Sequence, residues 1–68
     1  MKLELYDKAR LITDRFTTAE GVAQGALGYV IEIYEDGNCE VEFSDKDGVT
    51  YAQIVARPEE LEKVGAEK

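Results

Sequence analysis

The fold of this chain is decided by residues 26–43, which read Ala26-Leu27-Gly28-Tyr29-Val30-Ile31-Glu32-Ile33-Tyr34-Glu35-Asp36-Gly37-Asn38-Cys39-Glu40-Val41-Glu42-Phe43. Apolar and polar side chains alternate on both sides of an Asp-Gly pair. A period of two residues is typical of β-strands that bury one face, and Asp-Gly is a strong turn signal. The stretch therefore predicts a β-hairpin.

The length of the turn decides the register of this hairpin. A two-residue turn at Asp36-Gly37 would place Ile33 opposite Glu40, so that buried aliphatic side chains would share a face with carboxylates. A three-residue turn, Glu35-Asp36-Gly37 with Gly37 left-handed beside a bulge, groups the apolar side chains instead. We predict the second register, in which the pairs facing the core are Ile33 with Cys39, Ile31 with Val41, and Tyr29 with Phe43.

The segments before the hairpin predict one strand and one long connection. The strand is expected within Leu5–Asp14, after a polar turn. Residues 15–25 show no sustained alternation, although Thr18-Ala19-Glu20-Gly21 favours a single helical turn. Loops of this length carry binding function or are held down by an apolar anchor, for which Phe16 and Val22 are the candidates.

The segments after the hairpin predict a fourth strand and a short helical turn. Asp45-Lys46-Asp47-Gly48 forms a turn into a strand at Val49–Val55, where Tyr51 and Val55 compete with Ala52 and Ile54 for the inward face, so the register stays open. The only proline breaks the sheet within Arg57-Pro58-Glu59-Glu60-Leu61 and favours one helical turn. Leu61 and Val64 are the last expected core residues, and residues 65–68 are expected to form a frayed tail.

Six short stretches follow one another in a recognisable order: Leu5-Tyr6-Asp7, Gly25-Ala26-Leu27-Gly28-Tyr29-Val30, Glu35-Asp36-Gly37, Glu40-Val41-Glu42-Phe43, Tyr51-Ala52 and Glu60-Leu61. In that order they resemble, over nearly the whole chain, a family of short bacterial proteins known only as a domain of unknown function. The skeleton is also similar to the SH3-like barrels of electron-transport accessory proteins, such as a small protein of photosystem I and the β-subunit of nitrile hydratase, and to the KOW-type barrels of ribosomal and transcription proteins. Gly25, Gly28 and Val30 fill the Gly-x-x-Gly-x-Val stretch that opens the second strand in those barrels.

The pattern and the resemblance together give the expected fold class. Short strands separated by turn signals predict a small, strongly bent barrel. The resemblance implies an all-β, SH3-like barrel of about five bent antiparallel strands, with one long early loop and a short helical turn before the last strand. It also implies a protein that docks onto larger proteins. We expect residues 1–64 to form this single domain.

The charge of the chain argues against nucleic acid as a partner. The formal net charge is −7 and the sequence pI is near 4.4, whereas affinity for phosphates comes from Lys and Arg. The KOW-type proteins that contact RNA use basic loops, which this chain lacks. Lys2, Lys8, Arg10 and Arg15 either form a local basic stripe or are ordinary solvated charges.

The acidic residues are densest around the hairpin. Between Glu32 and Asp47 seven carboxylates face only Lys46 as a nearby cation. One interpretation is solubility and protection of the sheet from edge pairing. The other is a docking face for a basic protein partner, which complementary charge would attract and select. The candidate partner-binding residues are Glu32, Glu40, Glu42, Tyr34 and Tyr51.

The residue types exclude most catalytic chemistry. The chain has no histidine and a single cysteine, Cys39, which we interpret as a small core residue rather than a reactive thiol. Glu32 and Glu40 are expected opposite each other on an exposed face without a cleft, and Asp45-Lys46-Asp47-Gly48 lacks the remaining ligands of a calcium loop. We therefore expect no enzyme, no cofactor and no metal site. Without a signal-peptide pattern or a long apolar run, we also expect a cytoplasmic protein that does not bind membranes.

Two functional hypotheses remain. The first is a non-catalytic accessory module that docks onto a larger protein through its loops or through exposed Tyr6, Tyr34 and Tyr51. The alternative is an acidic antitoxin or immunity-type protein that covers the basic active site of a nuclease-like toxin. A homodimer is a further option, because a small barrel with open strand edges would gain buried area by pairing.

Overall fold

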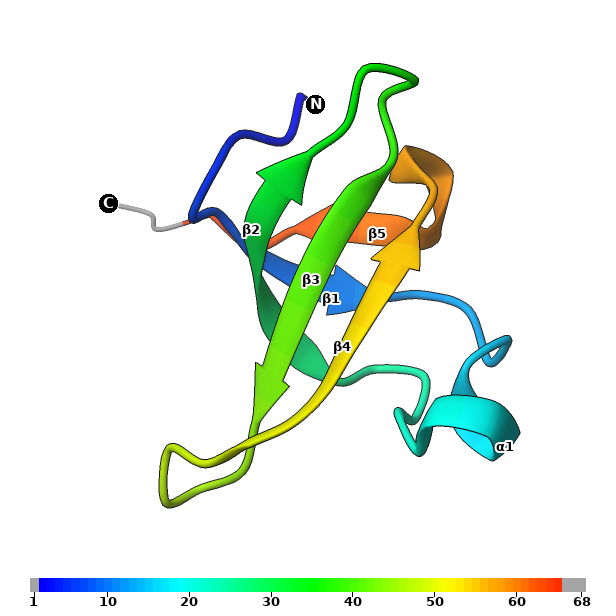
Figure 1. Cartoon of the computed structure of the whole chain (residues 1–68), viewed down its shortest axis with the longest axis vertical. Coiled ribbons are helices and arrows are strands. Elements are labelled where there is room, and N and C mark those ends of the chain that lie inside the picture. Colours follow the sequence, from blue (N-terminus) through cyan, green and yellow to red (C-terminus); the bar gives the residue numbers. More distant parts are fainter. Residues whose placement is uncertain (1, 66–68) are drawn as a thin grey trace.

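The computed structural model describes residues 2–65 and contains a single antiparallel sheet. Its elements are β1 (Lys8–Leu11), α1 (Thr17–Glu20), β2 (Leu27–Ile33), β3 (Cys39–Ser44), β4 (Thr50–Ala56), the 3-10 turn η1 (Pro58–Glu60) and β5 (Leu61–Lys63). The strands follow the order β4-β3-β2-β1-β5. Figure 1 shows β2, β3 and β4 side by side, with β1 and β5 running across them. The predicted mostly β fold, with a helical turn before the last strand, is confirmed, and no pairing joins the edge strands β4 and β5 within the described part of the chain.

The turn of the central hairpin has the predicted three-residue form. The Tyr34 amide donates to the Asn38 carbonyl at 2.8 Å, and the Gly37 amide donates to the Tyr34 carbonyl at 2.9 Å. Gly37 is left-handed, with a φ of 91°. The predicted pair of Ile33 with Cys39 is present, as is the predicted position of Glu32 opposite Glu40.

Beyond these pairs the predicted register is wrong, because β2 contains a bulge between Val30 and Glu32. The extra residue reverses the faces of the residues that precede it. The observed pairs are Val30 with Val41 and Gly28 with Phe43, in place of Ile31 with Val41 and Tyr29 with Phe43. Tyr29 consequently turns outward and is 50% exposed, while Ile31 is only half-buried.

Close packing at Gly28 accounts for this shifted register. A Cβ atom at this position would lie 2.7 Å from the Glu42 carbonyl oxygen and 2.9 Å from Cδ1 of Phe43. Only glycine leaves room for the Phe43 ring, which is fully buried against β2. Ile33, also predicted in the core, is exposed where β2 ends beside the turn.

The outer segments follow the predictions more closely. β1 is confined to residues 8–11, with Ala9 and Leu11 buried. In β4 the open register is resolved in favour of Ile54, which is buried, whereas Tyr51 and Val55 are exposed. A second bulge lies in β4, opposite the step from Phe43 to Ser44, and leaves Tyr51 outside the regular pairing.

The long connection is fastened as its sequence predicted. α1 ends at Gly21, which is left-handed with a φ of 74°. Phe16 and Val22, the expected anchors, are both buried, and the Arg15 guanidinium lies 4.3 Å from the centre of the Phe16 ring. α1 itself buries no residue, so only its two flanks attach it to the domain.

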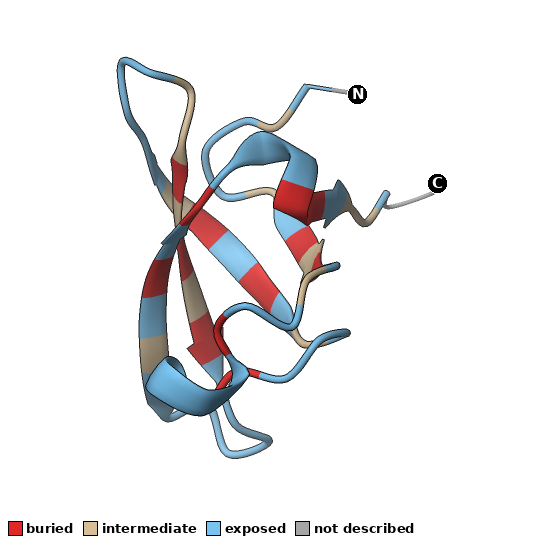
Figure 2. Ribbon diagram, turned by 90° about the vertical axis from the view of Figure 1, so that its right-hand side faces the viewer, coloured by how far each residue is buried: buried red, intermediate tan, exposed pale blue. Residues whose placement is uncertain are grey.

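The core lies on one side of the sheet, under the long connection. In Figure 2 buried and exposed residues alternate along the strands, as expected for a sheet with one covered face. The predicted last core residue Leu61 is buried, but Val64 is only half-buried. Of the expected tail, Gly65 is exposed and residues 66–68 lie outside the described residues. The buried apolar residues are Ala9, Leu11, Phe16, Val22, Val30, Cys39, Val41, Phe43, Ile54, Ala56 and Leu61.

Candidate functional site

The face of the sheet that points away from the core gathers three of the predicted acids. Glu32, Glu40 and Glu42, here called the acidic face, come from β2 and β3. Cross-strand pairing arranges them in two rows, Glu32–Glu40–Val55 and Tyr29–Glu42–Gln53. Among residues 2–65 no Lys or Arg forms an ion pair with any of the three carboxylates. Lys8 lies opposite Tyr29 in the second row, but no ion pair within residues 2–65 neutralises these three carboxylates.

Two of these carboxylates are held in place by hydroxyl groups. The Tyr34 hydroxyl donates to Oε1 of Glu40 at 2.5 Å, and the Thr50 hydroxyl donates to Oε2 of Glu42 at 2.7 Å. The hydrogen bond to Glu40 raises the pKa of Tyr34 above its usual value, with additional contributions from partial burial and from the charge of Glu32. The acidic face thus presents carboxylates with restricted orientation, which reduces the entropy lost when a partner binds.

The predicted tyrosines separate into two locations. Tyr34 joins the acidic face through Glu40. Tyr51 lies at the β4 bulge, with its ring 6.4 Å from the ring of Phe43, so it belongs to the other side of the strand. Tyr29 takes its place among the acids, opposite Glu42. Sequence alternation assigned Tyr29 to the core, and no local signal revealed the bulge that reverses it.

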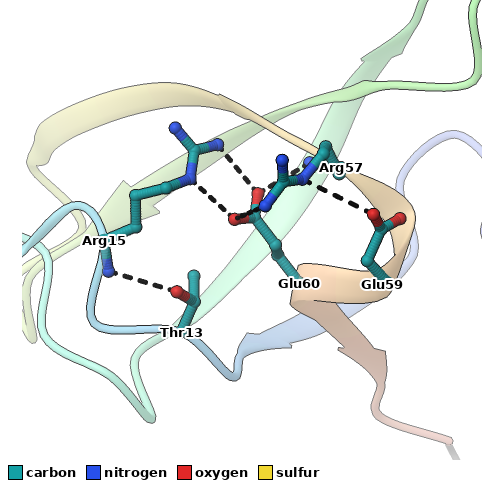
Figure 3. A network of polar contacts seen from close by, with 5 residues as sticks. All are labelled: Thr13, Arg15, Arg57, Glu59 and Glu60. Atoms are coloured by element: carbon teal, nitrogen blue, oxygen red, sulfur yellow. Dashed lines mark hydrogen bonds and ion pairs between the residues drawn. The ribbon is translucent and has the colours of Figure 1, made fainter.

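A second polar cluster, which sequence analysis missed, surrounds Glu60 (Figure 3). The Arg15 guanidinium donates two parallel hydrogen bonds to this carboxylate, from Nε to Oε2 at 2.6 Å and from Nη2 to Oε1 at 2.8 Å. Arg57 donates its backbone amide to Oε1 at 2.9 Å and its Nη2 to Oε2 at 3.1 Å. Glu60 is only 5% exposed, and the hydrogen bonds from Arg15 are the main cause that lowers its pKa to about 2.

The Glu60 cluster fastens the fold and does not form a binding site. Each of its oxygens already accepts two hydrogen bonds, so the carboxylate has no free capacity for a ligand. Arg15 belongs to the long connection and Arg57 to the segment before η1, so the cluster ties two distant parts of the chain together. The hydrogen bond from the Arg57 amide to Glu60 is one half of a capping box, but arginine is not a usual N-cap residue, so the local sequence carries no signal for it.

Two concave regions are lined by residues other than Glu32, Glu40 and Glu42, although Tyr29 borders the second one. One has a volume of about 240 Å³ and is mainly apolar, with Leu3, Ile33, Cys39 and Pro58 among its lining residues. Burial raises the pKa of the Cys39 thiol, which keeps it protonated and unreactive. This agrees with its interpretation as a core residue.

The other concave region has a volume of about 490 Å³ and lies between the start of β1 and the end of β5. Its walls include Tyr6, Tyr29, Lys8 and an ion pair of Lys63 with Asp7 at 3.3 Å. Tyr6 is 74% exposed and is the one non-glycine residue with positive φ in the described part of the chain, at 69°. A left-handed conformation is uncommon for a bulky residue and cannot be inferred from the sequence.

Residues 2–65 contain neither a cluster of metal ligands nor a helix that could span a membrane. Within residues 2–65 no group of three or more His, Cys, Asp or Glu side chains is placed to hold a metal ion. No helix in that range is long and apolar enough to cross a bilayer.

Comparison with known proteins identifies the family of this chain. Neither the curated proteins nor the solved structures include a match. The family model described as "Domain of unknown function (DUF4926)" matches residues 5–63, which include all five strands and both helical turns. The chain therefore belongs to the DUF4926 family, a domain of unknown function.

Proposed function

We propose that this protein is a small, non-catalytic accessory module of the cytoplasm that docks onto a larger protein through its acidic face. The observation that carries this proposal is the position of Glu32 directly opposite Glu40, with Glu42 on the same face and no cation paired with any of them among residues 2–65. Like charges placed directly opposite across two strands destabilise a sheet. A basic surface on a partner would relieve that repulsion.

The surroundings of the acids favour docking over simple solubility. Exposed Tyr29, Tyr34 and Val55 lie among the carboxylates, on the same surface. Aromatic side chains commonly carry much of the binding energy of protein interfaces, while surrounding charges supply selectivity and a faster encounter. Solubility alone would require neither the apolar groups nor the hydroxyls that orient Glu40 and Glu42.

The scaffold that we propose for this module is an SH3-like barrel. The support is the order of the strands, in which β1 lies between β2 and β5, together with η1 immediately before β5. The sheet is strongly bent, so that β1 and β5 run across the β2–β3–β4 meander in Figure 1. Such a scaffold holds the acidic face on regular strands, where side-chain positions are better defined than on loops.

The proposal is tested by capture of partners from an extract of the native cells. The bait is the intact chain, compared with the triple variant Glu32→Gln, Glu40→Gln and Glu42→Gln, whose amides have nearly the shape of the original carboxylates. We expect the variant to retain about tenfold less of a specific partner at low salt, because charge steers and selects the encounter. For the unaltered chain, retention should fall as salt is raised.

A matched control separates the acidic face from total charge. The variant Glu4→Gln, Asp14→Asn and Glu20→Gln removes the same three charges from exposed positions that form no ion pair among residues 2–65. It should capture the partner as well as the unaltered chain does. Equal capture by both triple variants and by the unaltered chain would refute docking through the acidic face.

The same surface supports one alternative, an acidic antitoxin or immunity-type protein. The carboxylates of the acidic face, which form no ion pair among residues 2–65, would cover the cationic active site of a nuclease-like toxin. The identity of the captured partner distinguishes the two functions. A toxin would be inhibited by the intact chain and would regain activity when Glu32, Glu40 and Glu42 are neutralised, whereas the partner of an accessory module would keep its activity.

A further inference from the structure

The two edges of the sheet differ in length and in charge. β5 has three residues, two of which are charged, Glu62 and Lys63. β4 has seven residues and none of them is charged, although 34% of the chain is. Proteins commonly protect exposed sheet edges with charge, proline, bulges or short strands. The only such feature of β4 is the bulge at Tyr51, which leaves the edge from Ala52 to Ala56 unprotected.

The pairing register identifies the backbone groups on this edge. At the β3–β4 turn the Asp45 amide donates to the Val49 carbonyl at 2.9 Å, and this bond sets which residues of β3 face β4. Because hydrogen-bonded and non-bonded pairs alternate along an antiparallel ladder, β4 bonds to β3 through Ala52, Ile54 and Ala56. The amides and carbonyls of Gln53 and Val55 therefore point away from the sheet. No hydrogen bond from another segment reaches them within residues 2–65.

The free edge of β4 ends before Arg57, because the backbone amide of that residue already donates a hydrogen bond. The next residue of the same parity is Arg57, whose amide donates to the Glu60 carboxylate at 2.9 Å. The open edge is thus limited to Gln53 and Val55, whose side chains are also exposed and lie next to Glu42 and Glu40. An added strand would meet two free donors, two free acceptors and an acidic neighbour.

The charge of that neighbour determines the kind of strand that fits. A strand added to β4 would lie two strand spacings from β3, about 10 Å away. Lys or Arg side chains on its outer face would extend over neutral Val55 and Gln53 toward Glu40 and Glu42. Alternate side chains would point to the other face, beside Ile54, where apolar groups are favoured. A second copy of this chain fits less well, because β4 carries no cation to neutralise the acids and each copy adds a charge of −7.

We propose that the free edge of β4 binds an extended segment of the partner protein as an additional β-strand, with basic and apolar residues alternating along that segment. This rests on the proposed docking function and specifies its geometry. Backbone hydrogen bonds to Gln53 and Val55 supply affinity, and the acidic face selects the basic side chains.

The test uses a short synthetic peptide in which Lys and Val alternate, added to the intact chain labelled with ¹⁵N. We expect the amide signals of Gln53 and Val55 to shift and to become protected from solvent exchange. A peptide in which Glu replaces every Lys should not bind. The same Lys-Val peptide with N-methyl groups on alternate amides, which removes one row of backbone donors, should bind about tenfold more weakly.

Variants of the chain test the edge itself. Val55→Pro removes an amide that points outward and none that bonds to β3, and proline is tolerated at such edge positions. Binding of the peptide should fall about tenfold, whereas Val55→Thr, which keeps the amide and the branched shape, should bind like the unaltered chain. If Val55→Pro does not fold, the N-methylated peptide provides the same test from the other side of the interface.

Three results would overturn the added strand. One is the absence of peptide binding. Another is binding that shifts only the acidic face and is unaffected by Val55→Pro and by N-methylation, in which case the proposed docking function would stand without the added strand. The third is a dimer in sedimentation that Val55→Pro abolishes, which would assign the edge to a second copy. Failure of the docking function is judged separately, by the triple glutamine variant in the capture experiment.

Discussion

The two halves of this domain use charge in opposite ways. Every ion pair among residues 2–65 lies within or between residues 7–15 and 57–63, the segments that hold β1, η1 and β5: Arg10–Glu62, Arg15–Glu60, Arg57–Glu59, Arg57–Glu60 and Lys63–Asp7. In the same described part of the chain, the meander of β2, β3 and β4 forms no ion pair, although it carries the acidic face. One half uses its charges in ion pairs that link its segments, whereas the carboxylates of the other half form no ion pair among these residues, which is the basis of the proposed docking.

Strand length explains why only one half needs ion pairs. β2, β3 and β4 contain seven, six and seven residues, and they bury Val30, Val41 and Phe43 between them. β1, η1 and β5 contain four, three and three residues. Short elements bury little apolar surface, so polar links between them contribute a larger share of their stability.

Among the substitutions considered, Arg15→Met in the ion-paired half should lower the free energy of unfolding most. Arg15→Met removes two hydrogen bonds from buried Glu60 and leaves Arg57 as its one cationic partner within residues 2–65. Arg15 is 48% exposed, but Glu60 is buried, so its carboxylate would be left as a poorly compensated buried charge. We therefore expect the free energy of unfolding to fall by about 3 kcal/mol. Urea denaturation followed by circular dichroism measures this change.

Arg10→Met is the matched control for this variant. The Arg10–Glu62 pair has an N–O distance of 2.9 Å, but its side chains are 43% and 56% exposed. Exposed pairs contribute little, so the loss should stay below about 1 kcal/mol. If Arg15→Met and Arg10→Met lowered the free energy of unfolding equally, the burial of Glu60 would not contribute to the strength of its ion pair.

A smaller effect appears in the pH dependence of the ion-paired half. The pKa of Glu60 is about 2 in the folded protein, below the usual value of about 4.3 for an unfolded chain. A lowered pKa stabilises the fold above the unfolded value, and this contribution is lost as the pH falls toward 2. The unaltered chain should therefore exceed Glu60→Gln in stability at pH 7, and the difference should shrink between about pH 4.3 and 2.

Denaturation curves at several pH values measure that difference. The stability of Glu60→Gln should fall less steeply over the same range, because glutamine does not titrate. A difference that stays constant from pH 7 to pH 2 would mean that Glu60 is not held ionised by its arginines.

The sequence predicted the elements of this fold better than their faces. Turn residues act locally: Gly37 has the left-handed conformation predicted for it, and Gly21 ends the predicted helical turn in the same conformation. Phe16 and Val22 were identified because large apolar residues in a polar loop have few alternatives to burial. The β2 bulge depends instead on a contact between Gly28 and Phe43, which are far apart in the sequence, so alternation alone assigned Tyr29 to the wrong face.

The candidate site was predictable to the same extent. Glu32 and Glu40 pair as predicted because both lie on the turn side of the β2 bulge. Glu42 keeps its predicted face because β3 contains no extra residue. The face of Tyr51, which the sequence left open, is set by the bulge at this position. The hydrogen bonds between Arg15 and Glu60 join residues 45 positions apart, and nothing in the sequence near either residue indicates this ion pair.

A change of only a few tenths of a kcal/mol is expected in the meander of β2, β3 and β4, at the Glu32–Glu40 pair. Glu32→Gln removes one charge from the pair that faces Glu40 and leaves the bond from Tyr34 to Glu40 intact. Relief of a like-charge cross-strand pair should raise the free energy of unfolding by a few tenths of a kcal/mol. The gain should vanish at about 1 M salt, where the screening length is only about 3 Å. Glu4→Gln, the same change at an exposed position outside the sheet, should give a smaller gain. A loss of stability in Glu32→Gln would instead mean that Glu32 supports the fold, and the contrast between the two halves would no longer hold.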